Sequence, residues 1–125
     1  MAAAAATAVR TLIVEDDQDS ADALARALAE HGHDVNVVGS VGKALVRLEM
    51  GLPPQVVILD LRLPDASGGL LLRRVRRDRL DIKVAVVTGV ADAESNLDLK
   101  RFPPDALFRK PVQFRDLLGW LESVT

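Results

Sequence analysis

The chain has 125 residues and a net charge of −2, and it contains no cysteine and only two histidines. This length is typical of one domain, and the lack of cysteine excludes thiol nucleophiles, disulfides and thiolate metal sites. The small net charge gives no general attraction for nucleic acid, and no apolar run is long enough to cross a bilayer. We therefore expect one soluble, cytoplasmic domain over residues 9–125, preceded by a frayed tail over residues 1–8.

Five short apolar runs alternate with helical patterns along the chain, and we interpret these runs as strands. They cover residues 9–14, 34–38, 55–59, 82–87 and 105–109. The third run, Gln-Val-Val-Ile-Leu, is apolar almost throughout, which is typical of a strand buried on both faces of a parallel sheet.

Helical patterns, with apolar residues three or four positions apart, follow each of these strands. Ser40 is placed to cap the second helix, and Pro103 and Pro104 end the fourth, which is short and polar. The expected helices cover about residues 19–29, 41–48, 69–77, 93–101 and 114–121.

The alternation of strand and helix predicts an α/β fold, in which helices cover both faces of a parallel sheet. Because crossover connections between parallel strands are right-handed, few topologies remain. We predict a doubly wound, five-stranded parallel sheet of the flavodoxin-like (βα)5 type, with strand order 2-1-3-4-5. This order places the first and third strands side by side at the switch point, where ligands bind beyond the carboxyl ends of the strands.

Conspicuous polar residues follow four of the expected strands. Asp16 and Asp17 follow the first strand, Asp60 the third, Thr88 the fourth and Lys110 the fifth. Three carboxylates at one sheet edge repel each other unless a hard cation or a lysine compensates their charge. Carboxylate oxygens suit Mg²⁺, whereas a lysine and a hydroxyl suit the oxygens of a phosphoryl group. The pattern therefore predicts a Mg²⁺ and phosphoryl site at this edge.

The motifs at these strand ends resemble those of the receiver domains of two-component signalling proteins, over about residues 9–121. Each motif alone is weak, but their order and their places at strand ends make the combination specific. The motifs are Val14-Glu15-Asp16-Asp17, Leu59 to Asp65 with Gly68, Val87-Thr88-Gly89 and Arg109-Lys110-Pro111.

The resemblance implies a phosphorylation switch in a phosphorelay, rather than an enzyme that acts on other substrates. Asp60 would accept a phosphoryl group from a sensor histidine kinase or a histidine phosphotransfer protein, in a Mg²⁺-dependent reaction. Asp17 would bind Mg²⁺ directly, Asp16 would bind it chiefly through water, and the backbone carbonyl of Arg62 would complete the protein's share of the ligands. The downstream target and the oligomeric state stay open.

The same resemblance assigns roles to residues after the fourth and fifth strands. Lys110 would pair with one phosphoryl oxygen and Thr88 would move towards another, and the Lys110–Pro111 peptide bond would be cis. The family usually has Tyr or Phe three residues before this lysine, as a side chain that swings inward on activation, but this chain has Leu107. The neighbouring Phe108 points to the opposite face of its strand and is a poor substitute.

Other interpretations of these residues compete with the switch. Asp16 and Asp17 also suit the first turn of a helix, and Asp60 could open an ordinary Asx turn. The chain could then be an interaction module that accepts no phosphate. A third hypothesis is a Mg²⁺-dependent aspartyl phosphatase, but such haloacid-dehalogenase-like enzymes need a second aspartate where this chain has Arg62. The arginines of residues 73–79 are interpreted as a solvated helix face, so we expect neither direct nucleic-acid binding nor membrane binding.

Overall fold

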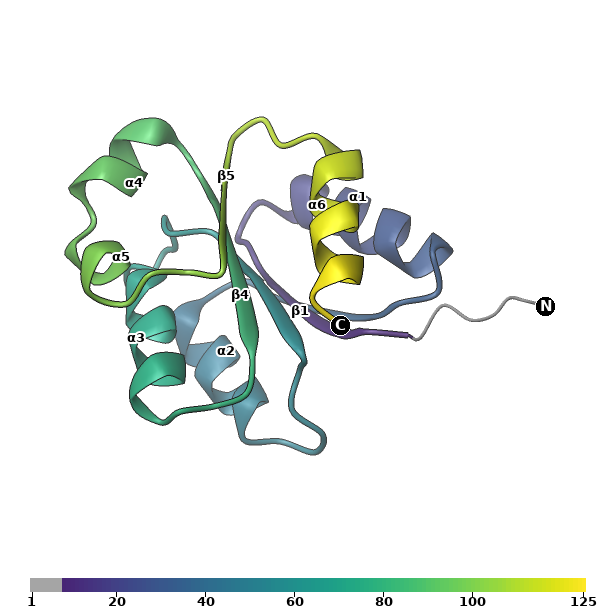
Figure 1. Ribbon diagram of the computed structural model, residues 1–125, viewed down its shortest axis with the longest axis horizontal. Helices are drawn as coiled ribbons and strands as arrows, with labels where there is room; N and C mark the ends of the chain where they lie inside the picture. The colour runs from purple at the N-terminus through teal and green to yellow at the C-terminus, as the bar shows by residue number, and fades with distance from the viewer. Residues whose placement is uncertain (1–7) are drawn as a thin grey trace.

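The computed structural model describes residues 8–125 and contains a five-stranded parallel sheet in the order β2-β1-β3-β4-β5 (Figure 1). This confirms the predicted fold, and every strand ends within one residue of its predicted bounds. The predicted tail over residues 1–8 falls almost entirely outside the described residues. The strands are β1 (Arg10–Val14), β2 (Asp34–Val38), β3 (Val56–Leu59), β4 (Lys83–Thr88) and β5 (Ala106–Arg109).

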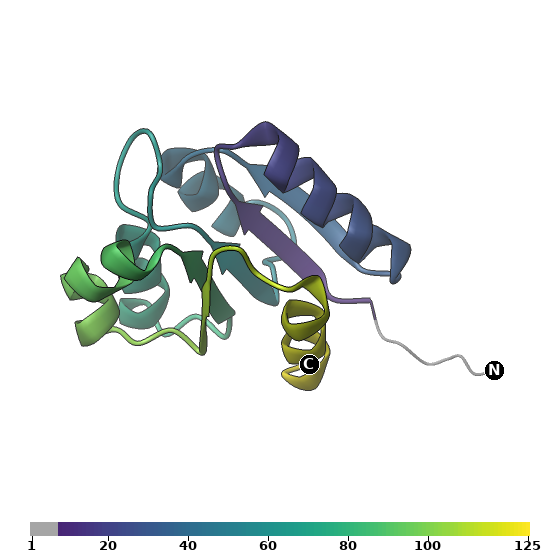
Figure 2. The same cartoon turned by 90° about the horizontal axis from the view of Figure 1, so that it is seen from above.

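Helices cover both faces of the sheet (Figures 1 and 2). Side chains of α1 and α6 pack on one face, and those of α2, α3 and α5 pack on the other. No helix within residues 8–125 combines the length and apolar character that a bilayer-spanning segment needs. The helices are α1 (Gln18–Glu30), α2 (Val41–Leu48), α3 (Gly69–Arg77), α4 (Val90–Ser95), α5 (Leu97–Arg101) and α6 (Phe114–Ser123).

The region between β4 and β5 differs from the prediction, which placed one helix over residues 93–101. The structure has two short helices there, α4 and α5, which are separated by Asn96. The backbone of Asn96 is extended, with φ −86° and ψ 115°, and its side chain accepts a hydrogen bond from the Leu99 N–H at 3.1 Å. Asparagine caps a new helix well because its short side chain bonds the exposed N–H groups of the first turn. The single helix was therefore a wrong prediction.

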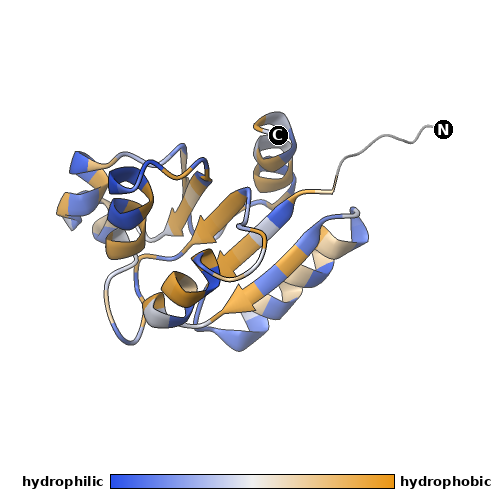
Figure 3. Cartoon of the chain, turned by 90° about the horizontal axis from the view of Figure 1, so that it is seen from below, coloured by the Kyte–Doolittle hydropathy of each residue, from blue (hydrophilic) through white to orange (hydrophobic). Residues whose placement is uncertain are grey.

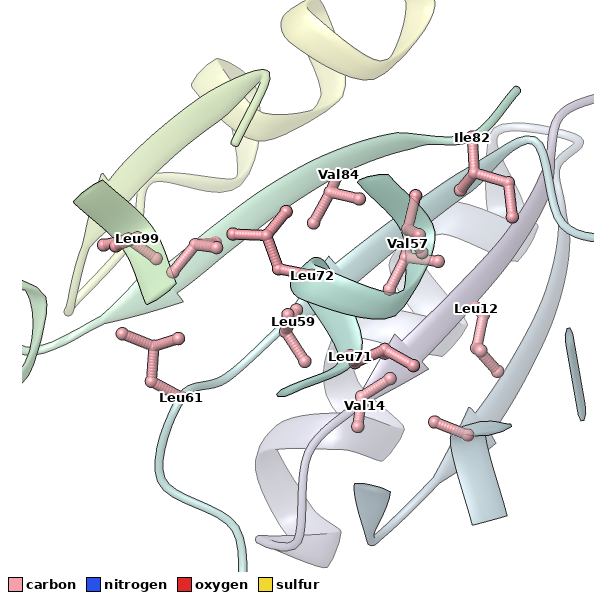
Figure 4. Packing of buried hydrophobic residues seen from close by; sticks show 13 residues of the cluster. Leu12, Val14, Val57, Leu59, Leu61, Leu71, Leu72, Ile82, Val84 and Leu99 are labelled. Atoms are coloured by element: carbon pink, nitrogen blue, oxygen red, sulfur yellow. The ribbon is translucent and has the colours of Figure 1, made fainter. Parts of the chain in front are cut away.

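The central strands consist mostly of hydrophobic residues, which Figure 3 colours orange. Nearly all residues of β3 and β4 are buried, as their composition predicts. Val57 and Leu59 of β3 belong to a cluster with Leu71 and Leu72 of α3 (Figure 4). Ile58, between them in sequence, points to the other face and joins the cluster formed with α1 and α6. A shift by one residue would exchange the two sets of side chains between differently shaped clusters, so close packing on each face fixes the sheet register.

The arginine-rich end of α3 is attached to the segment that precedes β5, so it is not simply a solvated face. Arg76 donates to the backbone carbonyl of Pro103 and forms an ion pair with Asp105, with Nη2 and Oδ2 2.9 Å apart. The same Asp105 oxygen accepts the Val84 N–H at 2.7 Å. Burial disfavours the charged carboxylate, but the bonds from Arg76 and Val84 outweigh this and lower the pKa of Asp105.

We predict that Asp105→Asn lowers the free energy of unfolding at pH 7 by about 1–2 kcal/mol, because a neutral amide loses the charge-assisted bonds. A carboxyl whose pKa is lowered by folding stabilises the protein above its unfolded pKa, and this contribution is lost as the pH falls through the folded value. The difference between the two proteins should therefore shrink as the pH falls below about 4, the usual pKa of an aspartate. Denaturant unfolding at several pH values measures it.

Asp81→Asn is the matched control, because Asp81 is exposed and makes no side-chain hydrogen bond or ion pair among the described residues. It should leave the unfolding free energy nearly unchanged. A destabilisation by Asp105→Asn that is independent of pH would contradict the role given to the charge.

Candidate functional site

The acidic cluster is built where β1 and β3 end side by side. Val14 and Leu59 are partners in the parallel ladder, and the Asp60 N–H donates to the Val14 carbonyl at 3.0 Å. The next residue of each strand, Glu15 and Asp60, therefore lies at the same edge. Carboxylate oxygens of Glu15, Asp16 and Asp60 lie within 4.8 Å of one another. The sheet register thus brings three acidic groups to one point.

Asp17 lies outside this cluster of three. It is the N-cap residue of α1, and its carboxylate accepts the Ser20 hydroxyl at 2.7 Å. The sequence motifs predicted an acidic pair of Asp16 and Asp17 and no role for Glu15, whereas the structure brings Glu15 and Asp16 to Asp60. Counting from the strand ends would have found Glu15. Glu15 directly follows Val14, and Asp60 directly follows Leu59, which is the ladder partner of Val14.

Lys110 supplies the positive charge of the site. Its Nζ lies 2.8 Å from Oδ2 of Asp60 and 3.1 Å from Oε1 of Glu15. Burial disfavours the charged ammonium, but the hydrogen bonds to Asp60 and Glu15 outweigh this effect and raise the pKa of Lys110. Lys110 therefore stays protonated and holds together two of the carboxylates that would otherwise repel each other.

Burial also raises the pKa of Glu15, and the nearby charge of Asp60 acts in the same direction. The Asp17 N–H, which donates to Oε2 of Glu15 at 3.2 Å, and the Lys110 ammonium oppose this shift without cancelling it. Burial and the neighbouring carboxylate thus both disfavour the negative charge of Glu15, and an added cation would favour it.

Asp60 is 7% exposed and opens the β3–α3 loop, residues 61–68. Its Oδ1 accepts the Arg62 N–H at 3.1 Å, which is the bond of an Asx turn. Asp60 therefore forms an Asx turn and also belongs to the acidic cluster, so the Asx turn is not an alternative to the cluster. The Arg62 side chain points away, and its guanidinium lies 3.4 Å from Asp92 of α4.

Asp65 attaches the β3–α3 loop to the start of α2. Its two carboxylate oxygens accept the Val41 N–H at 3.0 Å and the Gly42 N–H at 2.9 Å. These backbone bonds lower the pKa of Asp65. A negative charge is favourable at a helix N-terminus, where N–H groups have no partner within the helix. The loop that follows Asp60 is thus fixed to a neighbouring helix.

Thr88 lies at the end of β4 and is 1% exposed. Within residues 8–125 its hydroxyl oxygen is a buried side-chain atom without a hydrogen-bond partner. Buried hydroxyls are usually paired, so such an atom at the edge of a site indicates a group that is free to bond something else. The Thr88 carbonyl accepts the Lys110 N–H at 3.0 Å, which ties the ends of β4 and β5 together.

Comparison with known proteins identifies the family of this chain. A family model described as the response regulator receiver domain matches residues 11–122. The chain belongs to this family. It is 32% identical to the response regulator receiver protein CpdR of Brucella abortus, over 92% of this chain and 95% of CpdR. It spans about half the length of other curated relatives, such as ActR of Rhizobium meliloti, with 30% identity over 88% of this chain and 56% of ActR.

Solved structures of receiver domains superpose on the whole domain. A CheY-like receiver domain protein from Methanospirillum hungatei has a TM-score of 0.85 and 30% identity, with 94% of each chain covered. The receiver domain of DrrB from Thermotoga maritima, described as BeF3 activated, has a TM-score of 0.78 and 25% identity, with 94% of this chain and 97% of that chain covered.

This receiver domain lacks an aromatic residue at the position three before Lys110. Leu107 occupies that position and is 45% exposed. Phe108 points to the other face of β5, as strand alternation predicts, and packs edge-on against Trp120 with ring centroids 6.3 Å apart. Trp120 is thus a packing residue. The Lys110–Pro111 peptide bond is cis, as the resemblance implies.

An apolar groove of about 690 Å³ runs from Asp60 of the receiver domain along α1, between this helix and the segment from Lys110 to Phe114, the first residue of α6. Asp60, Asp17 and Lys110 line one part of it. Its walls are mostly apolar and include Leu24, Ala27, Val112 and Phe114. The groove therefore offers an apolar surface next to the carboxylate of Asp60.

We predict that Gly68→Ala destabilises the receiver domain by about 1–3 kcal/mol, because an added methyl group overpacks the β3–α3 loop. A Cβ at Gly68 would lie 2.2 Å from the Asp60 carbonyl oxygen and 3.0 Å from the Leu61 Cα. The backbone must shift to remove such a clash. Urea unfolding measures the loss.

Gly119→Ala is the matched control in the same chain. Gly119 is in the middle of α6, and a Cβ there would have no neighbour within 4 Å. Alanine is the better helix former, so this variant should gain about 0.5–1 kcal/mol. Equal stability of Gly68→Ala and the wild type would show that the contact with Asp60 imposes no constraint.

Proposed function

We propose that this chain is a phosphorylation switch in which Asp60 accepts a phosphoryl group from a phosphohistidine donor. One observation carries the proposal: Glu15, Asp16 and Asp60 converge at the edge of the sheet, with Lys110 bound to Asp60. A site of this kind combines a carboxylate nucleophile with charges that bind phosphoryl oxygens. We further propose that the switch works in the cytoplasm and catalyses at most its own phosphorylation and dephosphorylation.

The residues at the site fit Mg²⁺. Three carboxylates face a single ammonium group, so a divalent cation would balance their charge. Mg²⁺ prefers a few carboxylate ligands and keeps water and phosphate oxygens in its remaining positions. We propose that Glu15, Asp16, Asp60 and the Arg62 carbonyl hold the ion, with Asp16 in the role that the sequence analysis gave to Asp17. Bound there, Mg²⁺ supplies charge neutralisation for the phosphoryl oxygens.

In the proposed transfer, a carboxylate oxygen of Asp60 attacks the phosphorus of the phosphohistidine. The new P–O bond forms as the P–N bond breaks, and the donor imidazole leaves with the electron pair of that bond. Lys110, which contacts Asp60 and Glu15 beforehand, pairs with a phosphoryl oxygen after the transfer. The unpaired hydroxyl of Thr88 bonds another phosphoryl oxygen, and this bond draws the start of α4 towards the site.

We propose that the apolar groove along α1 receives a helix of the histidine kinase or phosphotransfer protein. The groove is lined by Leu24 and Phe114 and continues to Asp60. An amphipathic helix binds such a groove through its apolar face, and this would place a histidine on that helix close to the acceptor. Because Asp60 is nearly buried, docking next to it is needed for direct transfer.

We predict that incubation with Mg²⁺ and acetyl phosphate adds a single phosphoryl group to the wild type and none to Asp60→Asn, as measured by intact mass. Asp65→Asn is the matched control, because Asp65 lies on the same loop and bonds only α2. If rapid hydrolysis hides the adduct, Mg²⁺-dependent binding of beryllofluoride replaces it as the measurement. A wild type that shows neither would be an interaction module without phosphoacceptor chemistry.

The two neighbouring aspartates provide a direct test of the proposed ligands. We predict that Asp16→Asn weakens Mg²⁺ binding by about tenfold or more, because it removes a carboxylate from the cluster. Asp17→Asn should change Mg²⁺ affinity little and should mainly weaken the bond to Ser20 at the start of α1. Calorimetric titration with Mg²⁺ measures both. Loss of binding in Asp17→Asn alone would restore the original assignment of the direct ligand.

A further inference from the structure

Asn96, at the break between α4 and α5, bonds the β3–α3 loop as well as its own helix. Its Oδ1 accepts the Leu99 N–H at 3.1 Å, and its Nδ2 donates to the Ser67 hydroxyl oxygen at 3.0 Å. The backbone N–H of Leu99 can only donate, which fixes the oxygen of the amide towards α5 and the NH₂ group towards Ser67. One side chain therefore joins two segments that are 29 residues apart.

Ser67 is in turn closely connected to Asp60. Its hydroxyl oxygen also accepts the Gly69 N–H at 3.1 Å, at the start of α3, and its backbone pairs with Arg62 across the loop. Gly68 follows directly, and its Cα lies so close to the Asp60 carbonyl that no side chain fits between them. A displacement of Asp60 or Arg62 must therefore move Ser67 as well.

The packing around this hydrogen bond leaves little room for independent movement. A Cβ at Gly69 would lie 2.8 Å from Oδ1 of Asn96 and 2.8 Å from Cβ of Asp98. The first residue of α3 is thus in close contact with the first turn of α5. The Arg62–Asp92 ion pair joins the β3–α3 loop to α4 and not to α5, and it is exposed and contributes little.

We propose that the Ser67–Asn96 hydrogen bond couples the state of Asp60 to the start of α5. The inference rests on the proposed phosphorylation of Asp60 and adds a second connection to the one through Thr88. Occupation of the site rearranges the β3–α3 loop around Asp60, and Ser67 passes this change to Asn96 and the first turn of α5. Such a connection needs no aromatic side chain at position 107, where this chain has leucine.

Coupling between two sites is reciprocal, so the capped start of α5 also affects the acceptor. With the bond to Asn96 in place, Ser67 holds the loop that carries the Arg62 carbonyl. We therefore assign Asn96 as a positioning residue. Removing its bond to Ser67 should change the apparent affinity for beryllofluoride with Mg²⁺ by about fivefold or more, the lower end of typical coupling between sites.

The test uses nuclear magnetic resonance of the whole chain, titrated with beryllofluoride at saturating Mg²⁺. Asn96→Ser keeps a good N-cap for α5 but is too short to reach Ser67. Ser67→Ala removes the same bond from the other side and keeps Asn96. Ser95→Ala is the matched control, because exposed Ser95 bonds only the Asp92 carbonyl within α4. The Arg62 amide reports occupation of the site, and the Leu99 amide reports the response of α5.

In the wild type and in Ser95→Ala, both amides should shift on titration. In Asn96→Ser and Ser67→Ala, the Arg62 amide should still shift at saturation, whereas the shift of Leu99 should fall to less than half. Because Ser67→Ala also removes the acceptor of the Gly69 N–H, agreement between the two variants identifies the shared bond as the cause. Their double variant should show no further loss, since both changes remove one interaction.

Two results would overturn the inference, and only one of them would also overturn the proposed function. If Leu99 shifts equally in the wild type and in both variants while Arg62 shows full occupation, the coupling does not use this bond and the proposed phosphorylation stands. If the Arg62 amide of the wild type does not respond at all, the proposed function fails and the coupling fails with it.

Discussion

The repulsion between carboxylates at the ends of β1 and β3 is the constraint on which the site depends. The sheet register brings Glu15 and Asp60 to one edge, and Asp16 completes a cluster within 4.8 Å. Lys110 compensates part of this charge, while burial, together with the charge of Asp60, raises the pKa of Glu15. Such an arrangement is held only because the apolar core fixes the strands firmly in register. The favourable free energy of core packing thus offsets the repulsion between the carboxylates.

The loop that follows Asp60 is fixed on both sides, which explains how a small change at the site can be transmitted. Asp65 bonds the first N–H groups of α2, and Ser67 bonds Asn96 at the start of α5. Between them, Gly68 packs directly against the Asp60 carbonyl. A loop held in this way responds as one unit instead of absorbing a displacement locally. Closely packed contacts favour discrete rearrangements over continuous deformation.

The fold was predictable from the sequence because its signals are local and repeat along the chain. Each strand is a short apolar run, and burial on two faces leaves few alternatives for a run such as Val56–Leu59. The prediction was wrong where one polar residue changes the local structure. Asn96 ends one helix and caps the next because its side chain has partners in α5 and in the β3–α3 loop, and the second partner is 29 residues away.

The sequence by itself predicted the sheet order, the edge at which the polar residues gather and the residues Asp60, Thr88 and Lys110 at that edge. Only the tertiary structure decided which acidic residues meet. Glu15 and Asp16 join Asp60, whereas Asp17 lies at the N-cap position of α1 and bonds Ser20, because pairing between β1 and β3 fixes which residue stands opposite Asp60. The end of β1 was predicted correctly at Val14, and Glu15 directly follows it, but which of the three acids face Asp60 depends on the pairing of Val14 with Leu59. The exact ladder register is a property of packed strands and not of either strand alone.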